Sequence, residues 1–238
     1  MKDQPFLSIV IPARNEQELI ASTIENILPY TGINLVEIIV VDDHSTDDTS
    51  LIVKKLCSIH KEVKLVYNQK PAGFANALKT GFENASGEFV LPVMADGCDD
   101  PETIPLMIEK AKSGYDLICG CRYMKGAGKI GGPKLQGFFS RFVCLSLYYL
   151  ARFPTRDISN AFKAYRRSIL QDIRLKENGF AISMEAAMKF CLYGYRICDV
   201  PTFWVGRKKG KSKFRITRTF PYMKLYIYVL IKSWTKIL

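Results

Sequence analysis

Residues 6–16 read FLSIVIPARNE, and residues 36–49 read VEIIVVDDHSTDDT. In both stretches a run of aliphatic, β-branched residues ends abruptly in polar ones, which is typical of a strand buried on both faces of a parallel sheet. Between the two runs, Ile20, Ile24 and Ile27 recur at helical spacing. The order of strand, helix and strand predicts a parallel α/β unit at the start of the chain.

The same alternation continues to about residue 119. Helical patterns run over residues 73–84 and onward from Pro101, and further strands are expected at residues 63–67, 88–93 and 116–119. The fold class is therefore α/β, with a mostly parallel central sheet flanked by helices. Ligands of such sheets bind beyond the carboxyl ends of the strands. The segments expected at that edge are residues 12–16, 42–46, 94–100 and 121–125.

Composition and charge narrow the class of protein. The chain has 238 residues, of which 48% are hydrophobic and 24% charged, as expected for one globular domain with at most an appendage. The net charge is +11, and residues 117–156 and 201–238 contain no acidic residue. This asymmetry predicts an anionic partner: nucleic acid, a phosphorylated substrate or an acidic membrane face. Seven scattered cysteines and no leader sequence favour reduced thiols in the cytoplasm.

The polar residues at the strand ends limit the chemistry. No glycine-rich dinucleotide fingerprint follows the first strand, and no P-loop motif occurs. Instead the second strand ends in Asp42 and Asp43, and the fourth is followed by Asp96, Asp99 and Asp100. Carboxylates at these positions suit a nucleoside or a hard divalent cation, although each taken alone could simply cap the following helix.

Several motifs, in this order, resemble glycosyltransferase family 2, whose members are nucleotide-sugar transferases of the GT-A fold. The first two are VIPARNE at residues 10–16 and VVDDHSTDDT at residues 40–49. Other segments are similar to the branch typified by dolichol-phosphate mannose synthase: CGCRY (119–123), DISNAFKAYRR (157–167), DVP (199–201) and RKKGKSK (207–213). The resemblance implies a GT-A domain over residues 1–219, followed by an amphipathic helix over residues 220–238.

The resemblance assigns a donor site to the strand ends. It places the base and ribose of the nucleotide sugar against Pro12, Arg14, Glu16, Val41 and Asp43. Asp42 is expected to support these residues. It also places cations on the phosphates of donor and acceptor, namely Arg122, Arg207 and Lys213. The loop of residues 207–213 is expected to close over those phosphates.

A divalent metal is implied as well. In this family the fourth strand normally ends in Asp-Ala-Asp, whose aspartates bind Mg²⁺ or Mn²⁺ at the diphosphate. The aligned residues here are Met94, Ala95 and Asp96. A thioether is a poor ligand for a hard cation, so Asp96 is left as the expected metal ligand, with Asp99 able to assist. Asp96, Arg122 and Arg207 are the residues expected to act in catalysis.

The implied reaction is an inverting transfer of a sugar, mannose from GDP-mannose, to a polyprenyl or dolichyl phosphate. Such an acceptor is already anionic near neutral pH, so no general base is needed. The alternative acceptor is a saccharide hydroxyl of a cell-surface polysaccharide, which would need a carboxylate base. Asp157 and Glu185 are the candidates, unless each is a helix cap or the partner of an arginine. A relative without activity is a further alternative, whereas nucleic-acid binding is disfavoured because no such motif occurs.

Two segments predict attachment to an anionic membrane surface. Residues 138–153 are apolar nearly all the way round, and residues 221–238 form a helix with Lys224, Lys232 and Lys236 on one stripe. The second helix either lies in the lipid interface or docks on the domain. Neither segment is long enough to span a bilayer, so a peripheral protein of the cytoplasmic membrane face is expected. The glycine- and lysine-rich residues 126–137 between the two parts are expected to be a mobile loop.

Overall fold

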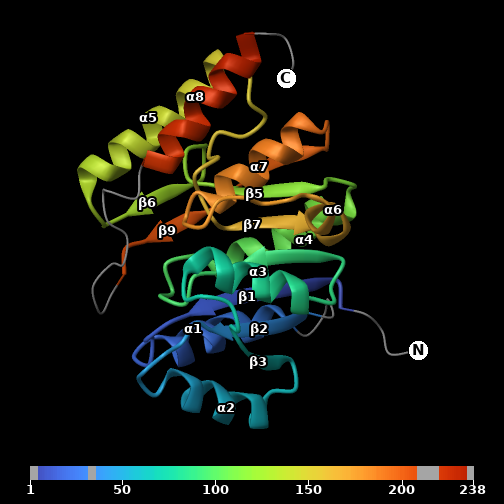
Figure 1. Ribbon diagram of the computed structural model, residues 1–238, viewed down its shortest axis with the longest axis vertical. Coiled ribbons are helices and arrows are strands. Elements are labelled where there is room, and N and C mark those ends of the chain that lie inside the picture. The colour runs from blue at the N-terminus through green and yellow to red at the C-terminus, as the bar shows by residue number, and fades with distance from the viewer. Residues whose placement is uncertain (1–4, 32–35, 208–219, 235–238) are drawn as a thin grey trace.

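The computed structural model describes residues 5–31, 36–207 and 220–234 (Figure 1). Its main sheet has seven strands in the order β3-β2-β1-β4-β7-β5-β8. These strands are β1 (Leu7–Ala13), β2 (Val36–Asp42), β3 (Val63–Tyr67), β4 (Phe89–Pro92), β5 (Leu117–Cys121), β7 (Lys163–Arg166) and β8 (Ile197–Pro201). The helices are α1 (Ile20–Ile27), α2 (Thr49–Ile59), α3 (Phe74–Asn84), α4 (Ile104–Lys112), α5 (Lys134–Leu150), α6 (Arg167–Asp172), α7 (Ile182–Leu192) and α8 (Phe220–Trp234), with 3₁₀ turns η1 (Leu28–Tyr30) and η2 (Pro101–Thr103).

The predicted α/β architecture is confirmed, and the five predicted strands are present. Strands β3, β2, β1 and β4 are parallel neighbours, and β8 runs parallel to β5. The sequence did not predict β7, which lies antiparallel between β4 and β5. As a result, β4 and β5 are not neighbours, and the carboxyl end of β5 is separated from the other parallel strand ends by one strand.

Helices cover both faces of the sheet. In β1, Leu7, Ile9 and Ile11 pack with α1, α2 and α4, whereas Val10 packs with α3 and the helices nearer the C-terminus. Successive side chains of a strand point to opposite faces, so a strand buried on both sides reads as an unbroken apolar run. Helix α3 lies so close to β1 that a Cβ at Gly81 would be 2.2 Å from Val10 Cγ1.

The expectation of a mobile loop at residues 126–137 is wrong. Those residues include β6 (Gly128–Ile130), which pairs with β9 (Phe203–Val205) in a small parallel sheet. Helix α5 then begins at Lys134, earlier than the expected helix of residues 138–153, and ends at Leu150. The pairing depends on β9, in which Phe203 pairs with Gly128, so local composition could not indicate it.

Helix α8 docks on the domain, which was one of the two alternatives for this segment. Leu225 and Val229, on the apolar side expected to face lipid, are buried in the core together with residues of α5 and α7. Figure 1 shows α5 and α8 side by side at one end of the molecule. A different set of apolar side chains of α8 is exposed, among them Ile227 and Ile231. Among the described helices, none is long and apolar enough to cross a membrane.

Candidate active site

The loops after β1 and β2 form one hydrogen-bonded unit. The Glu16 amide donates to Thr49 Oγ1 at 2.8 Å, and the Thr46 amide donates to Asn15 Oδ1 at 2.8 Å. The partners in these two bonds are 33 and 31 positions apart in the chain. The two loops that the sequence assigned to the donor therefore lie together, and their relative position is fixed.

Two residues of this unit have a left-handed backbone. The φ angle is 52° at Asn15 and 59° at His44, values that residues other than glycine adopt at a cost in conformational energy. The Asn15 amide donates to Ser45 Oγ at 3.1 Å, and His44 Nε2 donates to the Lys70 carbonyl at 3.0 Å. Specific hydrogen bonds thus hold the strained conformations, as is common at binding sites.

Asp42 and Asp43, at the end of β2, accept hydrogen bonds from neighbouring loops. Asp42 Oδ1 accepts the Ser45 amide at 3.3 Å. Asp43 Oδ1 accepts Asn68 Nδ2 at 2.7 Å, and both oxygens of Asp43 accept the Gly73 amide, at 2.9 and 3.1 Å. Since Gly73 immediately precedes α3, Asp43 ties the end of β2 to the start of α3, which is not the next helix along the chain.

Three other residues predicted for the donor lie at the same strand ends. Pro12 in β1 is paired in register with Val41 in β2. Val41 is buried, Pro12 is half-buried and Arg14 is exposed just beyond β1. The structure therefore gathers the predicted nucleoside residues at one edge of the sheet.

Arg207 reaches this edge from the far end of the sequence. It follows β9, and its guanidinium Nη2 pairs with Glu16 Oε2 in a mostly buried ion pair. The preceding segment is anchored because the Val205 amide donates to the Cys98 carbonyl at 3.0 Å. Two residues predicted for opposite ends of the donor, its nucleoside and its phosphates, are thus in contact. Lys213 and the rest of the expected lid, residues 208–213, lie outside the described residues.

The segment after β4 carries the predicted metal ligand. Ala95 is buried, and Asp96 is half-buried, with Oδ1 accepting the Cys98 amide at 3.2 Å. Asp99 is buried, and its Oδ2 accepts the Met94 amide at 2.9 Å. Burial raises the pKa of Asp99 to about 7, and the Asp96 charge adds to that rise. Asp96 is therefore the better anionic ligand of the two.

These residues fit a divalent metal only in combination with a bound diphosphate. Among the residues that the structure describes, no group of three or more His, Cys, Asp or Glu side chains is arranged to hold a metal ion. Mg²⁺ is commonly bound through one or two carboxylates together with substrate phosphates. Asp96 can supply one such carboxylate, whereas the Met94 thioether in the aligned position cannot replace the second.

Arg122, just after β5, is fixed by a buried carboxylate. Its Nε donates to Asp157 Oδ2 at 2.7 Å, and its Nη2 donates to Asp157 Oδ1 at 2.9 Å and to Ser159 Oγ at 3.1 Å. Burial would raise the pKa of Asp157, but the Arg122 guanidinium outweighs burial and holds that pKa below its usual range. The guanidinium therefore stays charged and has a defined orientation.

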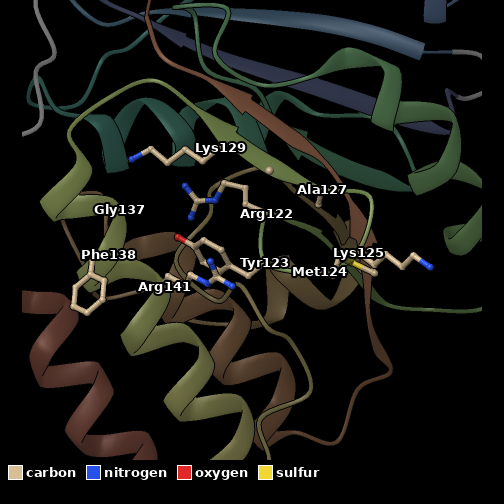
Figure 2. A pocket seen from close by; sticks show the side chains of 10 residues that line it. Arg122, Tyr123, Met124, Lys125, Ala127, Lys129, Gly137, Phe138 and Arg141 are labelled. Carbon is tan, nitrogen blue, oxygen red and sulfur yellow. The ribbon is translucent and has the colours of Figure 1, made fainter.

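Arg122 forms part of the wall of a basic pocket of about 590 Å³ (Figure 2). Three more cations line this pocket: Lys125, Lys129 and Arg141. None of its described lining residues is acidic. Phe138, on the first turns of α5, lines it as well, next to the aromatic outer face of that helix. The sequence did not single out these three cations as site residues, although all of them fall in the acid-free stretch of residues 117–156. The pocket suits an anion attached to an apolar group.

Both candidates for a general base have structural partners. Asp157 is the partner of Arg122, as one of the sequence alternatives held. Glu185 in α7 accepts Lys189 Nζ at 2.7 Å and the amides of Lys176 and Glu177. Its ion-pair partner is a lysine, not an arginine. Both carboxylates are thus held in ion pairs.

Comparison with known proteins decides the family. The sequence pattern described as "Glycosyl transferase family 2" matches residues 8–174. The chain belongs to glycosyltransferase family 2. That span includes both donor loops, Asp96, Arg122 and Asp157. Arg207 lies beyond the matched residues.

Two curated relatives of this family 2 chain have informative names. "Dolichol-phosphate mannosyltransferase" of Pyrococcus furiosus is 33% identical over 235 residues, which cover 95% of this chain and 64% of the relative. "Polyprenol monophosphomannose synthase" of Mycolicibacterium smegmatis is 28% identical over 215 residues, covering 86% of this chain and 79% of the relative. The chain therefore spans just under two thirds of the length of the Pyrococcus protein.

Solved structures confirm the GT-A fold expected for a family 2 member. Glucosyl-3-phosphoglycerate synthase from Mycobacterium tuberculosis, in complex with Mn²⁺, UDP and glucosyl-3-phosphoglycerate, superposes with a TM-score of 0.68 at 20% identity. The match covers 97% of this chain and 80% of that one. TarS from S. aureus (residues 1–349) matches with a TM-score of 0.64 at 20% identity, covering 95% of this chain and 64% of that one.

Proposed function

We propose that this protein transfers a sugar, mannose from GDP-mannose, to a polyprenyl or dolichyl phosphate at the cytoplasmic face of a membrane, with inversion at the anomeric carbon. The observation that carries the proposal is the basic pocket at Arg122, which opens beside the exposed aromatic side chains of α5. A lipid phosphate needs both features: cations for its head group and an apolar surface for its chain. The names of the two curated relatives support the same acceptor class.

On this proposal the strand ends bind the donor. The nucleoside lies against the predicted set Pro12, Arg14, Glu16, Val41 and Asp43, with Asp42 supporting the loop. Asp96 and the adjacent Ala95 face the diphosphate. A bound Mg²⁺ or Mn²⁺ would neutralise charge that develops on the departing diphosphate.

The cations serve the phosphates of both substrates. Arg207 would exchange its contact with Glu16 for the donor diphosphate, and Lys213 would join it there. Arg122, held rigidly by Asp157, would face the acceptor phosphate and the leaving group. Donors fixed in advance where negative charge develops lower a barrier because they need no reorganisation during the reaction.

The acceptor needs no general base. A phosphate monoester has a second pKa of about 6, so its oxygen is already a nucleophile near neutral pH. The lack of need for a base agrees with the structure, in which Asp157 and Glu185 each form an ion pair. The alternative acceptor, a saccharide hydroxyl, would need one of them to be available.

The outer faces of α5 and α8 provide the proposed membrane contact. Phe138, Phe139 and Phe142 of α5 are each more than half exposed, as are Ile227 and Ile231 of α8. Lysines and arginines nearby add attraction to anionic lipids, about 1 kcal/mol for each residue at the surface. The docked side of α8 is not available to lipid, so this contact uses its outward side.

The test is transfer of label from a panel of radiolabelled nucleotide sugars into butanol-extractable lipid, with polyprenyl phosphate or a soluble saccharide as acceptor. We expect label from GDP-mannose in the lipid. Arg141→Gln, inside the pocket, should lower kcat/KM for the lipid about tenfold. The control Arg196→Gln removes an exposed arginine that stacks on Tyr115 away from the pocket, and it should leave kcat/KM unchanged. Label only in the saccharide would overturn the proposed acceptor.

A further inference from the structure

One lysine of the chain is completely buried and lies outside the pocket. Lys163, the first residue of β7, has no exposed surface. Its Nζ donates to the Ile158 carbonyl at 3.0 Å and also to the Asn160 carbonyl. Burial lowers the pKa of Lys163, while nearby groups that include Asp157 oppose the shift. Lysine is among the residues least often fully buried, so its place in β7 calls for an explanation.

The segment held by Lys163 is the one that holds Arg122. Between the two carbonyls stands Ser159, and one residue before them stands Asp157; both bind the Arg122 guanidinium. Asn160 also donates from Nδ2 to the Gly120 carbonyl at 2.8 Å, which ties the segment to β5 just before Arg122. Lys163 therefore touches neither the pocket nor Arg122, but it contacts the backbone on both sides of a guanidinium ligand.

The other end of the segment is held independently. Thr155 Oγ1 donates to Asp199 Oδ1, and the Arg156 amide donates to Asp199 Oδ2 at 2.9 Å. The Asp157 amide in turn donates to Thr155 Oγ1 at 3.1 Å. With Asp199 of β8 at one end and Lys163 of β7 at the other, residues 155–160 form a polar support beneath the pocket.

We propose that Lys163 is a positioning residue: by binding the Ile158 and Asn160 carbonyls it fixes the segment that carries Asp157 and Ser159, and through them it sets the orientation of Arg122 in the pocket. The effect on catalysis rests on the function proposed above, whereas the effect on Arg122 does not. A displacement of about 1 Å in a residue that orients substrate can cost a factor of about 100 in rate, so a lysine behind the site can matter as much as one in it.

The experiment compares Lys163→Met with Lys189→Met in the full chain. Lys189 is a matched control because it is also mostly buried, and its Nζ also donates to a backbone carbonyl, that of Arg174, and to a carboxylate. It lies on α7 and does not contact residues 155–160. The first readout is the nitrogen-15 NMR signal of the Arg122 Nε–H, assigned by its loss in Arg122→Lys. The second is kcat and KM for transfer.

We expect the Nε–H of Arg122 to be protected from solvent exchange in the wild type and in Lys189→Met. In Lys163→Met it should exchange at least about tenfold faster, and kcat should fall about 10- to 100-fold with little change in KM for the donor. Lys163→Arg, which keeps donors for both carbonyls, should restore part of the protection. If Lys163→Met does not fold, Lys163→Gln, with one donor, replaces it under the same two readouts.

Two results separate the possible failures. If the Lys163 variants lose thermal stability but leave the Arg122 signal and kcat unchanged, the lysine serves only stability and the proposal is wrong. If the wild type transfers no sugar to any acceptor, the proposed function fails, yet the Arg122 signal still decides whether Lys163 positions it.

Discussion

The ion pair between Arg122 and Asp157 gives a prediction whose size follows from its burial. The Asp157 carboxylate is completely buried and the Arg122 side chain is 12% exposed. Arg122→Met keeps much of the apolar stem but leaves the carboxylate without its charged partner. Removing one member of a buried pair typically costs about 3–5 kcal/mol, because the remaining charge is buried without compensation. For a chain of this size that loss corresponds to a Tm lower by about 6–20 °C.

The matched variant is Arg122→Met combined with Asp157→Asn. In the wild type the backbone amide of residue 122 donates to Asp157 Oδ2 at 3.1 Å. Asparagine keeps an oxygen that can accept this hydrogen bond. Since the Asp157 charge is removed together with its partner, the double variant should recover at least about half of the free energy of unfolding lost by Arg122→Met. The assay is thermal and urea unfolding followed by circular dichroism at neutral pH.

The pH dependence supplies a second check on the same pair. Burial tends to raise the pKa of Asp157, but Arg122 outweighs it and lowers the folded-state pKa below the model-peptide range. A lowered folded-state pKa contributes stability that is present at neutral pH and is lost as pH falls through that pKa. In Arg122→Met only burial acts on Asp157 and raises its pKa, so the variant takes up a proton at a higher pH than the wild type does. The stability difference between wild type and Arg122→Met should therefore shrink progressively as pH falls from neutral. A single variant that loses under about 1 kcal/mol at every pH would refute the reasoning, since that is the behaviour of an exposed pair.

Three further predictions concern the donor metal, the membrane face and acid stability. Asp96→Asn should lower kcat at least about 100-fold, and Met94→Asp should tighten the Mg²⁺ dependence of donor binding measured by calorimetry; an unchanged Mg²⁺ titration would show that residue 94 does not face the metal. Ile227→Glu, on the outward side of α8, should weaken co-sedimentation with anionic vesicles about tenfold, whereas Ile59→Glu on α2, which is also exposed but lies on a different helix, should not; equal binding by all three proteins would remove α8 from the membrane contact. Glu37 accepts hydrogen bonds from two serines and Lys64, which outweigh burial and lower its pKa, so its contribution to stability should be lost as pH falls below about 4.5. In Glu37→Gln the free energy of unfolding, measured from pH 7 to 3, should therefore depend less on pH than in the wild type.

The strands and the donor edge could be predicted because their signals are local. A strand buried on both faces must be apolar along its length, so residues 6–11 and 36–41 can be recognised as strands from the sequence alone. In a parallel sheet the carboxyl ends of strands lie at one edge, so the sequence alone assigns Asp43, Glu16 and Asp96 to one site. The acid-free stretches likewise predicted that cations would gather, although not where.

Tertiary structure alone decided the rest, because each case depends on residues far apart in the chain. The insertion of β7 between β4 and β5 and the pairing of β6 with β9 depend on partners that local sequence does not reveal. Which side of α8 is buried depends on α5 and α7, and both sides of that helix carry apolar residues, so periodicity could not choose between them. The burial of Lys163 contradicts the preference of lysine for solvent, and only the two carbonyls that it binds explain its position. The sequence thus determined the fold class and the donor edge, whereas the folded chain decided which charges face the pocket and which lie behind it.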